Sequence, residues 1–249
     1  MPDFPHPIEP AMCTPQLRLQ ILHGLPFFRA LGHDDIRAVD AHFRERGFQP
    51  GETLYHAGEA ASHFYVVAAG NVRLLLHTLS GQDVLLDILI PGDFFVALPN
   101  VGQPGVSGYP DSAQAQTACC ALTVPTVRLR DILQDYPSAA LRLLEITAAR
   151  LQEAQETIRQ LSAYDAEQRI AATLLKLGDK LGQAREDDLL IGMPLSRQDI
   201  ADMTGATVET ASRILSSFRK QDLIRSGRQW IALRDVPALQ ALAGPGATR

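Results

Sequence analysis

Short apolar runs alternate with glycines through the first half of the chain, from Gly47 to Val127. The runs Phe64 to Ala68, Val72 to Leu76 and Val84 to Ile90 are apolar, and the glycines that bound them are often about eleven residues apart. Runs of this length between turn residues are typical of strands. The region therefore predicts a small antiparallel barrel or jelly roll.

Helical patterns lie on both sides of these strands. Leu17 to Phe43 has helical apolar spacing, and Pro26 and Gly32 divide it into short pieces. After Pro137, residues 138–162 contain neither glycine nor proline and are rich in Ala, Leu, Glu, Gln and Arg. Because these residue types favour helix, this segment predicts one long helix.

Five positions of the long helix alternate steps of four and three, which places them in the a/d seam of a coiled coil: Leu144, Ala148, Leu151, Gln155 and Ile158. One interpretation is that this face lies on the core of its own domain. The small Ala148 and the polar Gln155 suit close, register-specific pairing of two helices instead. We therefore expect a symmetric homodimer that pairs through these residues.

The last part of the chain predicts two helices joined by a glycine turn, after a helix from Asp165 to Leu181 and a polar loop from Gly182 to Asp188. Ser196 to Asp199 has the capping-box form, in which a hydroxyl caps a helix start and an acidic residue reaches back to it. Gly205 is suited to end that helix, and the capping residue Thr207 begins the next. Helix, glycine turn and helix form the helix-turn-helix arrangement.

On the second of these helices, Glu209, Ser212, Arg213 and Ser216 share one face. A short outward polar face near a helix N-terminus suits the major groove, where Arg bonds guanine and Glu accepts from cytosine. Candidate phosphate contacts lie around the two helices: Ser196, Arg197, Thr207, Thr210 and Lys220. The alternative is an ordinary amphipathic helix in which Glu209 and Arg213 form an ion pair one turn apart.

The distribution of charge favours a nucleic-acid partner for the C-terminal part alone. The whole chain has a net charge of −5, but residues 166–249 hold 12 basic and 10 acidic side chains, against 11 and 18 in residues 1–165. The stretch from Arg213 to Arg228 contains five basic residues and a single acidic one. Local positive charge can meet a phosphate backbone, so we expect double-stranded DNA as a partner.

Residues 225–233 then predict a turn and strands, a wing in which Trp230 is structural.

The cysteines indicate neither a disulfide framework nor a metal site. Cys13, Cys119 and Cys120 contain no CxxC pair, and we expect reduced thiols. The vicinal pair could form a redox switch, but neighbouring strand residues point to opposite faces, which favours buried, inert thiols.

Neither a secretory signal nor a membrane-spanning apolar stretch is evident, so we expect a cytoplasmic protein without membrane contact.

Two sets of motifs resemble the CRP/FNR family of bacterial transcription regulators. Those of the first half are Gly51-Glu52, His56 to Glu59, Phe64 to Gly70, Gly81 and Pro91 to Phe94, and those of the second half are Leu195 to Ala201 and Thr207 to Arg213. The resemblance spans nearly the whole chain and implies an α+β fold. Its parts would be a jelly-roll sensor domain (a double-stranded β-helix) at 1–137, a dimerisation helix at 138–164 and a winged helix-turn-helix at 165–249.

Within this family, the Glu-x-x-Ser-Arg pattern of Glu209, Ser212 and Arg213 resembles the fumarate-nitrate type, which reads a TTGAT-like half-site. Val208 stands where the cyclic-AMP receptor type has an additional arginine. The resemblance therefore implies that these three side chains contact bases on a palindromic site, and that RNA polymerase is a further partner.

The sensor region departs from the members that bind cyclic AMP. Those members follow the Gly-Asp-Phe turn with Gly-Glu-x-Leu and later have an Arg-Ser pair, where this chain has Val96 to Pro99 and Asp111-Ser112. An apolar stretch cannot neutralise a buried phosphate, and Asp111 would repel it. Ala154 and Gln155 match the polar pair that reads adenine. Cyclic AMP is therefore not expected.

Other effectors of the family fit only in part. Oxygen-sensing members hold an iron–sulfur cluster through four cysteines, several of them N-terminal, so a chain with Cys13 alone there should have none. Val96 and Leu98 replace the haem ligands of the carbon-monoxide sensor, yet the apolar loop from Phe94 to Pro110 resembles nitric-oxide-responsive regulators that accept haem. Haem remains an alternative for an otherwise unknown effector, whose expected contacts are Phe94, Val96, Leu98, Ala154 and Gln155.

A jelly roll also supports metal-dependent oxygenases, which makes an enzyme the alternative from another class. Such an enzyme needs clustered His and carboxylate ligands, typically with a His-x-His pair, and the sequence has no such pair. We therefore predict neither a catalytic nor a metal site. The sequence favours a DNA-binding regulator that a small effector or a redox change controls.

Overall fold

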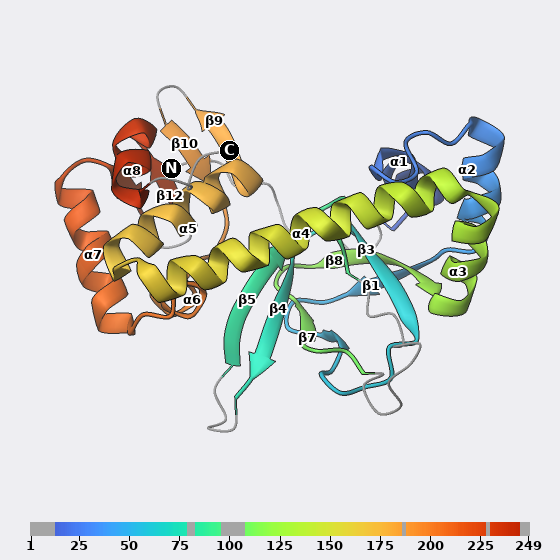
Figure 1. The fold of residues 1–249 in the computed structure, drawn as a ribbon, viewed down its shortest axis with the longest axis horizontal. Coiled ribbons are helices and arrows are strands. Elements are labelled where there is room, and N and C mark those ends of the chain that lie inside the picture. Colours follow the sequence, from blue (N-terminus) through green and yellow to red (C-terminus); the bar gives the residue numbers. More distant parts are fainter. Residues whose placement is uncertain (1–12, 79–82, 96–107, 186–187, 228–229, 245–249) are drawn as a thin grey trace. The chain divides into compact units, whose positions relative to one another are not determined.

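The computed structural model describes residues 13–78, 83–95, 108–185, 188–227 and 230–244. It contains two compact units, one that ends at Leu151 and one that starts at Gln152. Each is described by itself (Figure 1). The division falls inside a helix that both units share, so the expected three-part division of the chain stays a prediction.

Two short helices open the first unit, α1 (Pro15–Gly24) and α2 (His33–Asp40), as the apolar spacing predicted. Two four-stranded antiparallel sheets follow. The first has the order β1 (Arg44–Phe48), β8 (Cys119–Pro125), β3 (His63–Ala69) and β6 (Phe94–Phe95), and the second has the order β2 (Thr53–Tyr55), β7 (Ser112–Ala115), β4 (Val72–His77) and β5 (Asp83–Leu89). The predicted jelly-roll sensor fold is confirmed.

The central strands of the first sheet are buried on both faces. On β3, Phe64 and Val66 belong to one hydrophobic cluster, which the helices cover, and Tyr65 and Val67 belong to a second cluster between the sheets. Successive strand residues point to opposite faces, so one strand contributes to both clusters. The near-continuous apolar run of β3 follows from this double burial.

Helix α3 (Thr126–Asp135) leads into the long helix α4 (Pro137–Ala163), whose bounds agree with the predicted helix. Ala139 and Leu143 are its buried residues. The five seam positions are exposed instead, and the side chains of Leu144, Leu151 and Ile158 are 65%, 60% and 63% exposed. The interpretation that this face lies on the core of its own domain is therefore wrong.

A disulfide joins Cys13 to Cys120, so the expectation of reduced thiols is wrong for these two residues. Cys120 faces the cluster that α1 covers, and the start of α1 brings Cys13 to it across 107 residues of sequence. Sequence spacing could not show this approach. Cys119 is free and buried on the opposite face of β8, where burial raises its pKa to about 12, as expected of an inert thiol.

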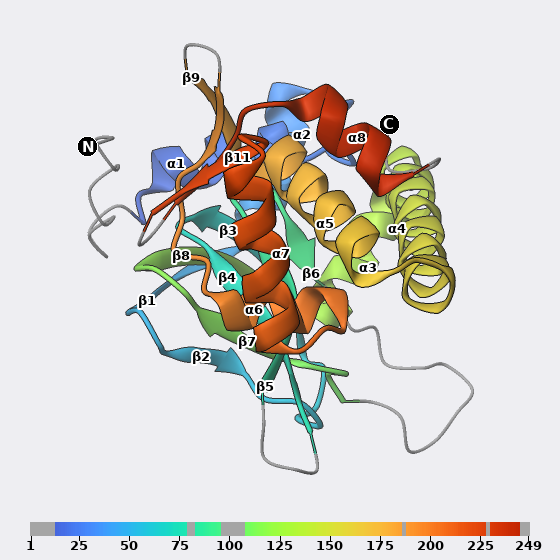
Figure 2. The ribbon, with the colours of Figure 1, turned by 90° about the vertical axis from the view of Figure 1, so that its left-hand side faces the viewer.

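The second unit contains a helical part and a four-stranded antiparallel sheet (Figure 2). Its elements are α5 (Ala166–Leu181), β9 (Gly182–Arg185), β10 (Asp188–Ile191), α6 (Arg197–Thr204), α7 (Val208–Lys220), β11 (Ile224–Ser226), β12 (Ile231–Leu233) and α8 (Val236–Ala243). Helix α5 packs against α6, α7 and α8. Strands β11 and β12 pair as the predicted wing.

The expected polar loop from Gly182 to Asp188 is wrong, because residues 182–185 form strand β9. This strand pairs with β10 at the edge of the sheet, and its Gln183, Ala184 and Arg185 are exposed. An exposed edge strand needs no apolar alternation and is often charged. The sequence pattern therefore carried no strand signal here.

Candidate nucleic-acid interface

The start and end of α6 follow the predicted capping chemistry. The Ser196 hydroxyl accepts from the Asp199 N–H at 3.0 Å, and the Asp199 carboxylate accepts from the Ser196 N–H at 2.7 Å. At the other end, Gly205 has φ of +60°, a left-handed conformation that favours glycine. These two features set the length of α6 and the direction in which the chain enters α7.

Arg169 of α5 fixes the end of α6 in place. Its Nε donates to the Thr204 carbonyl at 2.7 Å, and its Nη1 donates to the Tyr164 carbonyl at 2.6 Å. The guanidinium thus joins the turn of the helix pair to the residue that follows α4. Sequence analysis missed this contact, because it joins elements that are distant in sequence.

Helix α7 is amphipathic in the predicted sense. Its inner residues are buried: Ala211, Ile214, Leu215 and Phe218. Glu209 and Arg213 are exposed, and Ser212 and Ser216 are half-buried. Within the described residues Glu209 and Arg213 form no ion pair with each other, although the alternative interpretation needs this pair.

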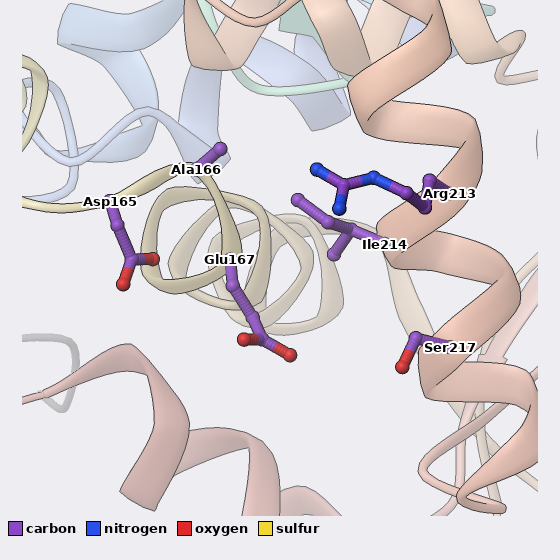
Figure 3. A pocket seen from close by; sticks show the side chains of 6 residues that line it. All are labelled: Asp165, Ala166, Glu167, Arg213, Ile214 and Ser217. Atoms are coloured by element: carbon purple, nitrogen blue, oxygen red, sulfur yellow. The ribbon is translucent and has the colours of Figure 1, made fainter.

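A pocket of about 350 Å³ lies beside this face (Figure 3). Its lining residues come from α7 and from the start of α5: Asp165, Ala166, Glu167, Arg213, Ile214 and Ser217. In Figure 3 the Arg213 side chain extends away from α7 toward this pocket. The candidate base-reading arginine therefore lies next to the turn between α4 and α5.

Two arginines lie close together beside the helix pair. The Nη1 atom of Arg197 is buried and has no hydrogen-bond partner within the described residues. Burial lowers the pKa of Arg197, and the positive charge of Arg219 lowers it further. A buried cation beside a second cation is unfavourable unless an anion joins them.

Arg219 was not among the predicted contacts, which placed Lys220 there. It follows Ser212 by seven residues and Ser216 by three, so helical spacing already puts it on the outward face. Lys220 is exposed at the end of α7. Part of the basic stretch is neutralised, because Arg225 lies 3.6 Å from the Asp188 carboxylate.

In the first unit, rings fill the space between the two sheets. Tyr55 stacks on Tyr109 with ring centroids 3.8 Å apart, and Tyr65 stacks on Phe95 at 5.0 Å. The Tyr55 hydroxyl donates to the Asp111 carboxylate at 2.9 Å, and burial raises the pKa of Asp111. The interior of the sensor fold is thus occupied by the chain's own side chains.

The neighbouring Ser112 hydroxyl is also bonded within the protein. It accepts from the Ala57 N–H at 2.9 Å and lies 2.8 Å from His77 Nε2. Asp111 and Ser112 are the residues at the place of the Arg-Ser pair that binds phosphate in cyclic-AMP-binding proteins. Both therefore have partners of their own.

Comparison with known proteins agrees with both units. Residues 45–136 match the cyclic nucleotide-binding domain, and residues 168–242 match the Crp-like helix-turn-helix domain. The chain is 27% identical over 201 residues to the fumarate and nitrate reduction regulatory protein of Salmonella typhimurium, an alignment that covers 81% of this chain and 79% of that protein. The chain belongs to the CRP/FNR family of transcription regulators.

Two solved structures have a similar fold. FixK2 from Bradyrhizobium japonicum is 27% identical and has a TM-score of 0.70, with 82% of this chain and 98% of that chain covered. A CooA mutant from Carboxydothermus hydrogenoformans also has a TM-score of 0.70, with 83% and 90% covered, but at 22% identity it shows the fold alone.

The effector contacts predicted for this CRP/FNR regulator are only partly described. Phe94 is buried, Arg150 Nη1 donates to its carbonyl at 2.8 Å, and the Arg150 guanidinium lies 4.1 Å from the ring centroid. Val96 and Leu98 lie outside the described residues. Ala154 and Gln155 are exposed on α4, in the other unit. This effector site, and haem, which depends on the same loop, therefore stay predictions.

Neither a metal site nor a membrane-spanning helix is evident in the part of this family member that the structure describes. Among the described residues, no group of three or more His, Cys, Asp or Glu side chains could hold a metal ion. None of the described helices is long and apolar enough to cross a membrane.

Proposed function

We propose that this regulator binds DNA as a homodimer and reads a palindromic, TTGAT-like site with Glu209, Ser212 and Arg213. A small effector other than cyclic AMP, or a redox change, controls the regulator. It acts on transcription in the cytoplasm together with RNA polymerase. The finer division into sensor, dimerisation helix and DNA-binding domain belongs to the same proposal.

The observation that carries the proposal is the outward face of α7. Its acid, hydroxyl and guanidinium share one side of a helix whose other side is buried, and Glu209 and Arg213 do not neutralise each other. An Arg side chain can bond guanine O6 and N7, and Glu can accept from cytosine N4. This chemistry supports base contacts by these residues.

The arginine pair supports contacts to the DNA backbone. A phosphate beside Arg197 and Arg219 would supply the anion that the buried Nη1 lacks in the described chain. The exposed Lys220 and the half-buried Thr210 extend the same surface. The Thr207 hydroxyl donates to Thr210 Oγ1 at 3.1 Å, which leaves the Thr210 hydroxyl proton available to a phosphate.

The exposed apolar ridge of α4 supports the homodimer. Leu144, Leu151 and Ile158 recur at seven-residue spacing and are more than half exposed. Side chains of this kind on a long helix are stabilised when a second helix covers them. A two-fold pair of chains would present two copies of α7 to half-sites about one turn of DNA apart.

The sensor interior supports an effector other than cyclic AMP. A cyclic nucleotide needs a cation for its phosphate and space for its base. Asp111 supplies an acidic group where the phosphate needs a cation, and four stacked rings fill the space between the sheets.

A binding experiment with two variants tests the proposal. A TTGAT palindrome and a shuffled duplex are compared by fluorescence anisotropy, and the wild-type protein should prefer the palindrome by about 1,000-fold or more. The double substitution Glu209→Ala and Arg213→Ala should reduce this preference to a few-fold while non-specific binding remains. Arg128→Ala, on the exposed surface of α3, is the control and should behave like the wild type. A double variant that keeps its preference would contradict the assignment.

A further inference from the structure

The Cys13–Cys120 disulfide joins two parts of one hydrophobic cluster. Cys13 precedes Thr14, whose hydroxyl accepts from the Leu17 N–H and caps α1. Cys120 lies on β8 between Gly47 of β1 and Ala69 of β3. The bond therefore attaches the start of the first helix to an inner strand of the first sheet.

The same cluster reaches the base of the long helix. Besides Cys120, it contains Leu129 and Ile132 of α3 and Ala139 and Leu143 of α4. The chain itself also runs from β8 into α3 and then α4. A change in packing around Cys120 therefore has a short physical route to α4.

We propose that Cys13 and Cys120 form a reversible thiol–disulfide site, whose state sets how firmly α1 is held on this cluster and thereby changes the affinity for DNA. The step to DNA rests on the proposed function. A protein that works on DNA shares a compartment with reducing thiols, where disulfides are usually transient and redox-sensing.

The two sulfurs differ in access. Cys13 is half-buried, whereas Cys120 is almost fully buried. A thiolate of a small dithiol attacks Cys13 Sγ, a mixed disulfide forms, and Cys120 leaves as a thiolate and takes up a proton. The second thiol of the reductant then displaces Cys13. Two electrons and two protons pass to the protein, and the reductant becomes a cyclic disulfide.

The reverse reaction uses a small disulfide such as oxidised glutathione. The Cys13 thiolate attacks it and releases one thiol, and Cys120 then displaces the second from the mixed disulfide. The buried Cys120 must lose its proton for this step, so the start of α1 has to open before the bond closes.

Reduction should loosen the start of α1 without unfolding the helix. Arg18 forms ion pairs with Asp40 and Glu45, and Leu22 and Leu25 remain in the cluster. These contacts do not depend on the disulfide. The change is therefore local, as a switch requires.

Cys119 provides a matched control. It is adjacent to Cys120, similarly buried and free, but its side chain packs in the other cluster. Cys119→Ala should leave the redox behaviour unchanged, while Cys13→Ser removes the bond from the half-buried side. Because Cys13 lies before the first helix, the serine variant should fold.

The test uses the whole chain described above, in buffers with defined ratios of reduced to oxidised glutathione. Wild type and Cys119→Ala should interconvert between two forms that differ by two hydrogen atoms in intact mass, and peptide mapping should pair Cys13 with Cys120. Amide hydrogen exchange at the start of α1 should be at least threefold faster in the reduced form. Cys13→Ser should show a single form with the faster exchange.

Affinity for the TTGAT palindrome is then measured for each form. We expect the two forms of wild type and of Cys119→Ala to differ at least threefold, and Cys13→Ser to be insensitive to glutathione. Equal affinities with a confirmed change of thiol state would overturn the regulatory step. A bond that never forms, or that joins two chains, would overturn the site itself. If no form binds the palindrome, the proposed function fails, while intact mass and amide exchange still test the thiol site.

Discussion

The exposed side of α4 and the helix pair α6–α7 differ from the interior of the sensor unit in how many of their groups have partners within the chain. Leu151 of α4 is mostly exposed, and the buried Nη1 of Arg197, at the start of α6, has no partner within the described residues. In the sensor interior, Tyr55 bonds Asp111, and Ser112 bonds the backbone of Ala57.

This difference shows which kinds of function a single chain reveals. Groups that lack partners indicate the chemistry of what will cover them, an apolar helix in one case and an anion in the other. Groups that already have partners indicate no ligand. The DNA-binding unit can therefore be interpreted from its own residues, whereas the identity of the effector cannot.

The largest effect should come from a charge on the apolar ridge of α4. Leu151→Glu would place two carboxylates together in a helix pair, so the protein should become monomeric. Its affinity for the palindrome should fall about 100-fold or more, because the two half-sites no longer bind together. Sedimentation velocity and anisotropy measure both changes. Thr157→Glu, on an exposed face of α4 away from the ridge, should remain dimeric.

A smaller loss is expected from the arginine pair. Arg197→Ala should weaken binding about tenfold on the palindrome and on a shuffled duplex alike, because a phosphate contact carries no sequence information. The slope of log Kd against log salt should decrease by about one. Anisotropy titrations across a salt series measure this slope. Loss on the palindrome alone would show that Arg197 contacts a base instead.

Within the sensor interior, the effect should be on stability and should depend on pH. Burial raises the pKa of Asp111, so its carboxylate form is disfavoured in the folded protein, and stability from this group declines as pH rises through that pKa. Asp111→Asn keeps an acceptor for Tyr55 and removes the charge. Its Tm should be higher by about 2 °C at pH 7 and equal to wild type in acid.

Differential scanning calorimetry across this pH range tests the expectation. Asp131→Asn changes an exposed carboxylate that pairs with Arg128 on α3 and serves as the control. A gain of equal size in both variants would mean that net charge, and not burial, causes the effect.

The smallest expected effect is none at all. Cyclic AMP in millimolar excess should not change the Tm, because the interior is filled by stacked rings and Asp111 opposes a phosphate. Thermal shift against an equal concentration of sodium phosphate measures this. A saturable rise in Tm with cyclic AMP alone would show that the sensor interior binds a cyclic nucleotide, which would contradict the comparison of the two regions.

Local chemistry made the helix pair predictable from the sequence. The capping box at Ser196, the turn at Gly205 and the periodicity of α7 involve residues within a few positions of each other. Local signals also predicted the strands β3, β4 and β5, since their apolar runs end at turn residues. Arg219 could have been found by the same periodicity.

What the sequence did not reveal depends on tertiary contacts. Strand β9 has no apolar pattern because its side chains are exposed at a sheet edge. The disulfide joins residues that only the packing of α1 brings together, and Arg169 caps α6 from another helix. The occupied sensor interior is of the same kind, because sequence spacing does not show that Tyr55 and Asp111 meet.

The contact between Arg150 and Phe94 has a practical consequence for protein engineering. The Arg150 guanidinium holds both the ring and the carbonyl of β6, almost four turns after α4 begins. A fusion that exchanged the sensor unit at Pro137 would separate Arg150 from Phe94. It would also remove Ala139 and Leu143 from the hydrophobic cluster to which they belong. Chimaeric proteins should therefore be joined after Leu151, so that the first half of α4 stays with the sheets of its own unit.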